Sequence, residues 1–333
     1  MSVINSFDEI VERFNLSARV EFNKQYEDLD PMLKSISYVF NSGAIAQSFF
    51  YVNLLFSSHR EFKGTQSYKK IDKTIKHSID NAEQEVEGVE VNTRDLKRAQ
   101  KANDISGLDM YIQSIGNIAK EAKNAPFEDS IDLLEQGATD TFGTCFDNQT
   151  LFSATHDFAG VAGTQSNLVT GTGISTAQIS NDLKVAMSRL LGFTFTVDNN
   201  DGSVKKKRKL NGKFGNPKWV VVCHTDQWAK FNDIRKAGLL VVDTNGGSQS
   251  NTLMNQFEII THPFADNDDY YLMDMSEPTV KPILISMEDE GSLVTPDDNS
   301  EARANLRTLR YAHQDLSYGL GYGAWWKAIK ITN

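Results

Sequence analysis

Leu316-Ser-Tyr-Gly-Leu-Gly-Tyr-Gly-Ala-Trp-Trp-Lys-Ala328 stands near the end of the chain and does most to define its fold. Large or apolar side chains recur at every second residue of this stretch, whereas Gly319, Gly321 and Gly323 occupy alternate positions. This period of two predicts a strand over residues 316–328. A face made of glycines implies that another backbone or bulky side chains approach it closely.

Further strands are predicted upstream of this stretch, at residues 218–224, 257–261, 270–274 and 280–286, with a short helix over 227–237. Apolar residues at helical spacing predict a helix opened by Ser6 and a second one opened by Pro31, in which the apolar repeat runs as far as Phe40. Further helices are predicted over 105–124, after a restart at Pro126, and over 175–191, with a loop-rich stretch over 139–173. Helices and antiparallel strands without repeating βαβ units indicate an α+β fold.

Residues 59–94 carry an unusual separation of charge. Residues 60–76 hold six basic and two acidic side chains, and residues 80–90 hold five acidic side chains and no basic one. We interpret this segment as a long two-stranded hairpin whose basic and acidic arms attract each other across the ladder, with a pair of solvated helices as the alternative. An isolated hairpin is marginally stable in water, and an apolar, aromatic segment over 44–56 precedes it, so both segments are expected to need a covering surface.

The composition excludes several classes of protein. With 333 residues, 40% hydrophobic and 23% charged, the chain is neither disordered nor fibrous. Its longest apolar runs are far shorter than the roughly 20 residues of a spanning helix, and no secretory signal is visible, so no membrane association is expected. A net charge of −10 disfavours nonspecific nucleic-acid binding as the main activity. The two cysteines, Cys145 and Cys223, are predicted to be buried fillers of a protein made in a reducing cytosol.

No catalytic or cofactor motif is present. The chain lacks a nucleophile elbow, a Walker A loop, an HExxH sequence and a GxGxxG sequence. The pairs His156-Asp157 and His224-x-Asp226 are the nearest approach to a metal or acid–base site, and we interpret both as loop polarity. We therefore predict no catalytic residue, no metal site and no cofactor, and hence no enzyme.

Three charged clusters remain. Lys205-Lys-Lys-Arg-Lys209 lies between Asp201-Gly202 and Asn211-Gly212, which predicts a hairpin tip. It is interpreted as a solvated loop or a contact with an acidic neighbouring subunit, in preference to a contact with a nucleic-acid backbone. The acidic groups at 288–290 and 297–298 are predicted to be solvated turn charges.

Several segments together resemble the major head subunit family of Mu-like tailed phages. The carrying residues are Ser78-Ile-Asp-Asn81 and Val86–Leu96 in the hairpin arm, then Cys145-Phe-Asp-Asn-Gln-Thr-Leu-Phe-Ser-Ala-Thr-His156. The latter is similar to the family's DGQ-x-x-F-x-x-x-H loop, with Asn148 where the family usually has Gly. Residues 270–274 and 281–285 resemble its W-Y-L-x-D and K-P-x-I stretch, and residues 319–328 its terminal Gly-Tyr-Gly-x-Trp strand. The similarity extends over about residues 20–333.

The resemblance implies the tailed-phage major capsid fold of the Hong Kong ninety-seven type. In this chain it implies an N-terminal arm (1–58), an E-loop hairpin (59–95) and a peripheral domain with a spine helix (96–164). An axial domain (165–275) and terminal strands shared between the peripheral and axial domains (276–333) would follow.

The implied function is that of a major capsid protein. Such a protein self-assembles, as hexamers and pentamers, into the icosahedral or prolate head of a tailed bacteriophage. Its implied partners are itself, a portal, a scaffold and decoration proteins, and the shell encloses double-stranded DNA without sequence-specific binding. The implied location is the virion, after assembly in the host cytoplasm. The alternative is an encapsulin-like compartment shell of the same fold; a cytosolic hydrolase is disfavoured by the missing motifs.

Overall fold

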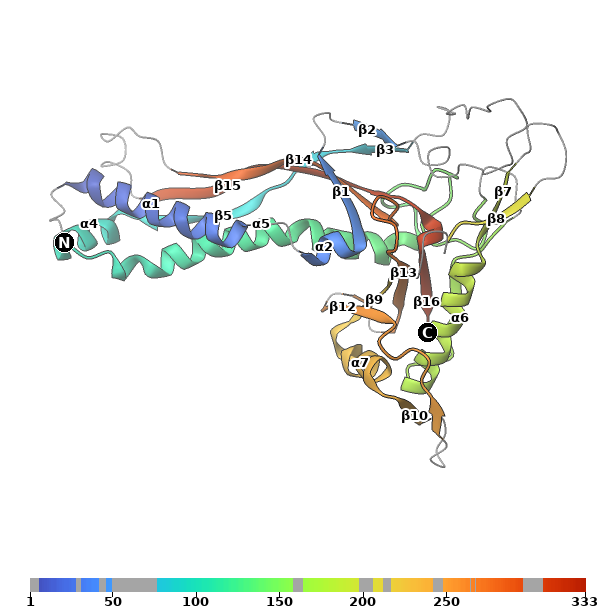
Figure 1. The fold of residues 1–333 in the computed structure, drawn as a ribbon. Helices are drawn as coiled ribbons and strands as arrows, with labels where there is room; N and C mark the ends of the chain where they lie inside the picture. The colour runs from blue at the N-terminus through green and yellow to red at the C-terminus, as the bar shows by residue number, and fades with distance from the viewer. Residues whose placement is uncertain are drawn as a thin grey trace, which may run out of the picture.

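The computed structural model of the chain has an elongated arm and a wedge that meet at an angle (Figure 1). The structure describes residues 6–27, 31–41, 46–49, 77–157, 164–197, 206–211, 217–241, 248–263, 265–266, 268–295 and 308–333. The N-terminal helix α1 (Phe7–Tyr26) lies in the arm, and the C-terminal strand β16 (Ala328–Thr332) lies in the wedge. Helices and strands are mixed in both parts, which confirms the predicted α+β class.

Helix α5 (Asp109–Glu135) is the spine of the molecule and contributes to both hydrophobic cores. Its 27 residues span about 40 Å at 1.5 Å per residue. The predicted apolar stripe is confirmed, since Ile115, Ile118 and Ala122 are buried. The predicted restart at Pro126 is wrong. Because Phe127, Ile131 and Leu134 are buried on the same helix, tertiary packing on either side of the proline offsets its missing hydrogen bond.

The arm is a sheet covered by helices. Its strands are β1 (Ser37–Asn41), β14 (Ile283–Val294), β15 (Thr308–Tyr322), β4 (Ala82–Glu83) and β5 (Val86–Asn92), and only β1 and β14 are parallel. Helices α1, α4 (Thr93–Ala102) and α5 bury their apolar faces in one core with β5 and β15. Ser6 caps α1, as predicted, by accepting a hydrogen bond from the Glu9 N–H. Helix α1 is much longer than expected, and α4 was not expected.

The wedge contains a second five-stranded sheet, in the order β12 (Phe257–His262), β9 (Trp219–His224), β13 (Tyr270–Asp274), β16 and β6 (Leu168–Thr170). Helices α6 (Thr176–Gly192) and α7 (Trp228–Lys236) pack against it, with Phe231 of α7 edge-on to Tyr270 at 5.1 Å. The next residue, Tyr271, points to the opposite face and stacks on Phe152 at 5.5 Å. Ser175 opens α6 with a complete capping box. The strands and helices predicted here are confirmed to within a few residues.

Two-stranded ladders and short 3₁₀ turns complete the fold. The ladders are β2 (Ala46–Phe49) with β3 (His77–Asp80), β7 (Thr194–Val197) with β8 (Lys206–Lys209), and β10 (Leu239–Val241) with β11 (Ser248–Ser250). The 3₁₀ turns are η1 (Ser106–Leu108), η2 (Gln136–Ala138), η3 (Thr225–Gln227) and η4 (Trp325–Lys327).

Several predictions about the N-terminal half are wrong. The helix opened by Pro31 (α2, Pro31–Ile36) ends before Val39 and Phe40, which belong to strand β1 because they pair with β14. Residues 86–92, at the end of the predicted acidic arm, pair with β15 in the subunit's own sheet, a partner that was not predicted. Residues 50–76, which include the basic arm and part of the apolar run after Ala44, lie outside the described residues.

Three predictions about the C-terminal half also need correction. The strand over 316–328 is interrupted: β15 ends at Tyr322, and η4 turns the chain through Trp325 into β16, which joins the other sheet. Lys206–Lys209 form a paired strand instead of a hairpin tip. Residues 288–290 lie in strand β14 beside a bulge after Met287, so they are exposed strand residues and not a turn. Residues 297–298 lie outside the described residues.

Candidate functional site

The loop that carries the DGQ-like motif folds as a tight turn at Asp147-Asn148-Gln149. The Asn148 N–H donates to the Cys145 carbonyl (2.9 Å), and the Cys145 N–H donates to the Gln149 carbonyl (2.7 Å). Asn148 has a φ of 58°, in the left-handed region that Gly adopts freely and Asn more readily than most residues. Asn at the position where the family usually has Gly is therefore compatible with the turn.

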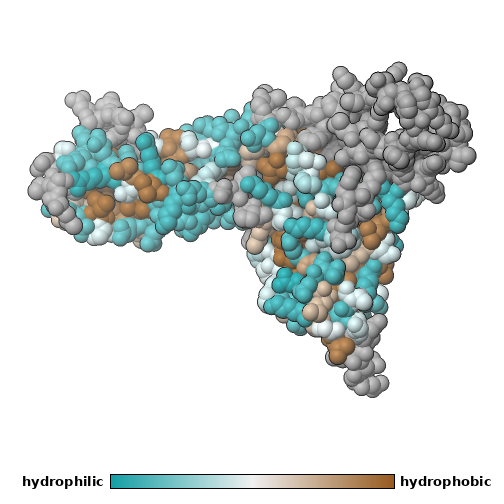
Figure 2. Space-filling model, in the orientation of Figure 1, coloured by the Kyte–Doolittle hydropathy of each residue, from teal (hydrophilic) through white to brown (hydrophobic). Residues whose placement is uncertain are grey.

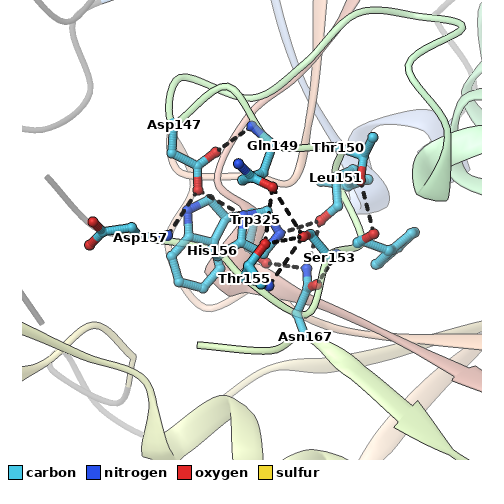
Figure 3. Close-up of polar contacts among 11 residues, drawn as sticks. Asp147, Gln149, Thr150, Leu151, Ser153, Thr155, His156, Asp157, Asn167 and Trp325 are labelled. Atoms are coloured by element: carbon cyan, nitrogen blue, oxygen red, sulfur yellow. Dashed lines mark hydrogen bonds and ion pairs between the residues drawn. The ribbon is translucent and has the colours of Figure 1, made fainter. Parts of the chain in front are cut away.

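His156 lies completely buried between Asp147 and Trp325 (Figure 3). Its Nδ1 is 2.8 Å from Asp147 Oδ2, and its Nε2 is 3.0 Å from the Leu151 carbonyl oxygen. The imidazole stacks on the indole of Trp325, with centroids 4.3 Å apart and planes 4° apart. Both ring nitrogens therefore face oxygen atoms that can accept hydrogen bonds. The arrangement is a buried histidine–carboxylate contact in which the imidazole lies over an aromatic face.

Asn167 connects this loop to the C-terminal segment (Figure 3). Its Nδ2 donates to the carbonyls of Leu151 (2.7 Å) and Trp325 (3.3 Å), and its Oδ1 accepts from the Ser153 N–H (2.9 Å). Asn167 is buried and precedes strand β6. Three segments that are distant in sequence are thus held together where the chain passes from the arm sheet into the wedge sheet.

The geometry of this cluster suits structural support better than catalysis. Both nitrogens of His156 already have partners, and the ring has no exposed surface. The hydroxyl of Ser153 bonds to Gln149 and Thr155 and not to His156, so these residues form no nucleophile–base pair. The sequence analysis paired His156 with the adjacent Asp157, whereas its actual partner, Asp147, lies nine residues earlier. The fixed spacing of the Asp and His within the DGQ-x-x-F-x-x-x-H motif was the signal that could have found it.

The other residues singled out from the sequence do not form a reactive site. His224 accepts from the Asp226 N–H (3.1 Å) at the start of η3, while the Asp226 carboxylate is largely exposed. Cys145 and Cys223 are buried, as predicted, and burial raises the pKa of the Cys223 thiol to about 12 and that of Cys145 well above its usual range. Within the described ranges, no three His, Cys, Asp or Glu side chains are placed to hold a metal ion.

Apolar side chains remain exposed on the surface of both parts. Leu16 and Val20 lie four residues apart on α1 and are 65% and 60% exposed, and Leu239 on β10 is 65% exposed. Figure 2 shows hydrophobic patches on the arm among a mostly hydrophilic surface. Isolated exposed apolar residues are common, but a pair at helical spacing forms a small stripe on the outer face of α1.

A groove of about 610 Å³ runs between β5 and α5 on the arm. Four glutamates line it: Glu85 and Glu87 from the strand side, and Glu121 and Glu128 from the helix. Within the described part of the chain, none of these four glutamates forms an ion pair, whereas the sequence 60–76 is strongly basic. The surface of the groove is therefore negatively charged, whereas the sequence 60–76 carries a net positive charge.

No helix of the described part of the chain is long and apolar enough to span a membrane.

Comparison with solved structures identifies the class of the fold. A chain of the procapsid of bacteriophage JBD30 matches with a TM-score of 0.53 and 15% identity, over 97% of this chain and 75% of that one. A chain from Mycobacterium phage Patience matches with a TM-score of 0.50 and 11% identity, over 98% and 87%. At these identities the likeness establishes the fold alone, which is that of a tailed-phage capsid subunit.

The family follows from the sequence itself. Residues 11–186, just over half of the chain, match the model of the Mu-like prophage major head subunit gpT. The chain belongs to this family, and it is a phage major capsid protein. The predicted resemblance is confirmed, and the match favours the phage shell over the compartment shell. A search of curated proteins found no match.

Proposed function

We propose that this major capsid protein self-assembles, as hexamers and pentamers, into the closed icosahedral or prolate head that encloses the double-stranded DNA of a tailed phage. Its implied partners are further copies of the chain, a portal and a scaffold, with decoration proteins on the outer surface. Assembly takes place in the host cytoplasm and the product is the virion. The net charge of −10 is consistent with a shell that encloses DNA without binding it tightly. We propose no catalytic activity.

The observation that carries this proposal is the form of the subunit. The arm is a thin layer of helices on a sheet, and it leaves apolar side chains such as Leu16 and Val20 exposed to solvent. An extended subunit of this kind gains little from burying its surface alone and much from neighbours that cover it.

The domains can be assigned on this basis. We assign the peripheral domain to 96–164 with α5 as its spine helix, and the axial domain to 165–275. The terminal strands (276–333) are shared, since β14 and β15 lie in the arm sheet and β16 in the wedge sheet. The N-terminal arm (1–58) begins with α1, which packs on α5. In the E-loop assignment (59–95), the β2–β3 ladder forms the base of the hairpin, and residues 86–92 belong to the peripheral sheet.

The acidic groove supplies a binding surface for a neighbour. We propose that the groove between β5 and α5 binds a basic surface of a neighbouring subunit, and the sequence 60–76, with six basic side chains, has the charge that this requires. Exposed ion pairs contribute only about 0–1 kcal/mol each, so their main effect is to select the correct neighbour and register. Reversing charge with the double substitution Glu121→Lys and Glu128→Lys should weaken shell closure, and a compensating reversal of Lys69 and Lys70 to Glu should restore it.

Sedimentation velocity tests the proposal directly. The purified chain should form capsomers or shells at micromolar concentration, and the double substitution Leu16→Glu and Val20→Glu should reduce assembly while leaving the circular dichroism spectrum unchanged. Val185→Glu, a change of another exposed apolar residue (51% exposed) on α6, serves as the control. A chain that remains monomeric at every concentration, with and without scaffold, would contradict the proposal.

A further inference from the structure

A lysine and an aspartate are buried together at the junction of η4 and β16 with β13. Lys327 and Asp274 have no exposed surface, and Lys327 Nζ lies 3.0 Å from Asp274 Oδ2. Strands β13 and β16 are antiparallel with Met273 opposite Ala328, so the register continues to place Asp274 opposite Lys327. The amine and the carboxyl are therefore held face to face by two neighbouring elements, in a place that water does not reach.

Two further groups surround this pair. Glu277 Oε1 lies 3.6 Å from Lys327 Nζ, and its side chain is 16% exposed, so it connects the buried pair to solvent. The Ser276 N–H donates to Asp274 Oδ1 at 3.1 Å. The two oxygens of Asp274 thus have different environments: Oδ2 faces the amine, and Oδ1 faces a backbone hydrogen-bond donor that is suited to stabilise negative charge.

A second cationic side chain lies close to this pair. A second buried lysine, Lys281, donates to the Met275 carbonyl at 3.0 Å in the same turn. Burial, and then the nearby charges of Lys218 and Lys327, lower the pKa of Lys281 to about 8. Lys327 and Asp274 are both withdrawn from water, so condensing them into a neutral amide would remove two opposite charges from a buried site.

We propose that Lys327 and Asp274 form an intramolecular isopeptide bond. After proton transfer, the neutral Nζ attacks Cγ of the protonated Asp274 carboxyl, and the Ser276 N–H stabilises the negative charge that develops on Oδ1. Glu277 takes a proton from the attacking nitrogen and delivers it to Oδ2, which leaves as water when the C–O bond breaks. One hydrogen stays on Nζ and two leave in the water, so an ammonium and a carboxylate become one amide and one water without any oxidant or cofactor.

The bond would covalently join the final strand of the chain to the centre of the wedge sheet. The β16 strand would then resist being pulled from β13, a useful property in a subunit whose terminal strands connect two sheets. The inference rests on the geometry of one chain and does not depend on the proposed assembly.

A matched pair joins β16 to Asp269, the residue just before β13. Lys330 Nζ is 2.8 Å from Asp269 Oδ2, but both side chains are partly exposed, at 13% and 9%. Water can stabilise the charged forms there, so this pair should remain an ordinary salt bridge.

Peptide mapping of the purified full-length protein tests the proposal. After denaturation and proteolysis, tandem mass spectrometry should find a branched peptide that joins residues 274 and 327, and the intact mass should be lower by one water. No branched peptide should join residues 269 and 330. Glu277→Gln, which keeps size and hydrogen bonding, should slow bond formation by about 100-fold or more, and Lys327→Arg should abolish it.

Only linear peptides at residues 274 and 327, together with the full intact mass of folded protein, would overturn the proposal. Equal linkage in wild type and Glu277→Gln would overturn the role assigned to Glu277. Circular dichroism shows whether each variant is folded, so that a missing linkage is counted only in folded protein. If a variant fails to fold, the wild-type protein still decides the question, because folded wild type without the linkage contradicts the proposal.

Discussion

Replacing His156 with Ala provides a demanding test of the buried cluster at the motif loop. The substitution removes the 2.8 Å contact with Asp147 and the stacking on Trp325. The Asp147 carboxylate, 4% exposed, would then keep only the backbone donors of Gln149 and Asp157, each at 3.3 Å. A buried charge that loses its partner costs about 3–5 kcal/mol, and the lost aromatic contact about 0.5–1.5 kcal/mol. We therefore expect His156→Ala to lower the free energy of unfolding by about 4 kcal/mol.

Urea unfolding followed by tryptophan fluorescence measures this loss. His224→Ala is the matched control, because that ring makes its contacts at the surface end of β9 and its removal should cost about 1 kcal/mol. A loss below about 1 kcal/mol for His156→Ala would refute the structural role assigned to the His156–Asp147 contact. If a measurable enzymatic turnover disappeared in either folded variant, the structural interpretation of these histidines would be wrong.

Three further predictions follow from single positions. Cys145 and Cys223 should resist thiol reagents in the native protein and react fully in urea, since both thiols are buried with raised pKa values; fast labelling of the native protein would contradict this. Asn148→Gly should leave stability nearly unchanged, whereas Asn148→Val should cost about 1–2 kcal/mol in urea unfolding because of the positive φ; equal effects would argue against a left-handed turn. The Lys281 pKa of about 8 lies below the usual 10.5, so the unfolded chain binds more protons between these values and stability should rise with pH there; Lys281→Met should show less of this rise than the wild type, and identical pH profiles would exclude the effect.

Individual helices and strands were predictable where burial of one face produces a regular pattern of apolar residues. Helix α6 begins at its capping box, and β13 has the predicted bounds, because these signals are contained in a few adjacent residues. At Pro126, local propensity predicts a break in the helix, but the packing of Phe127 and Ile131 keeps α5 continuous.

Pairings between strands that are distant in sequence were harder to predict from the sequence. Residues 86–92 pair with β15, and Val39 and Phe40 pair with β14, both more than 200 residues away. No pattern within the individual segments specifies such partners, so charge complementarity did not reveal that residues 86–92 pair with β15. The same limit applies to the site: the adjacency of His156 and Asp157 was visible, but the stacking on Trp325 depends on the turn that η4 makes between the two sheets.

Cryo-electron microscopy of the assembled protein is the most direct test of the central claim, that this chain is the tiling subunit of a phage head. The account predicts closed shells built from hexamers and pentamers, with the wedges of neighbouring subunits around each capsomer axis and the arm faces of α1 and α5 in contact with adjacent subunits. Particles without closed symmetry, or monomers whose arm faces remain uncovered at every concentration and with scaffold present, would contradict it.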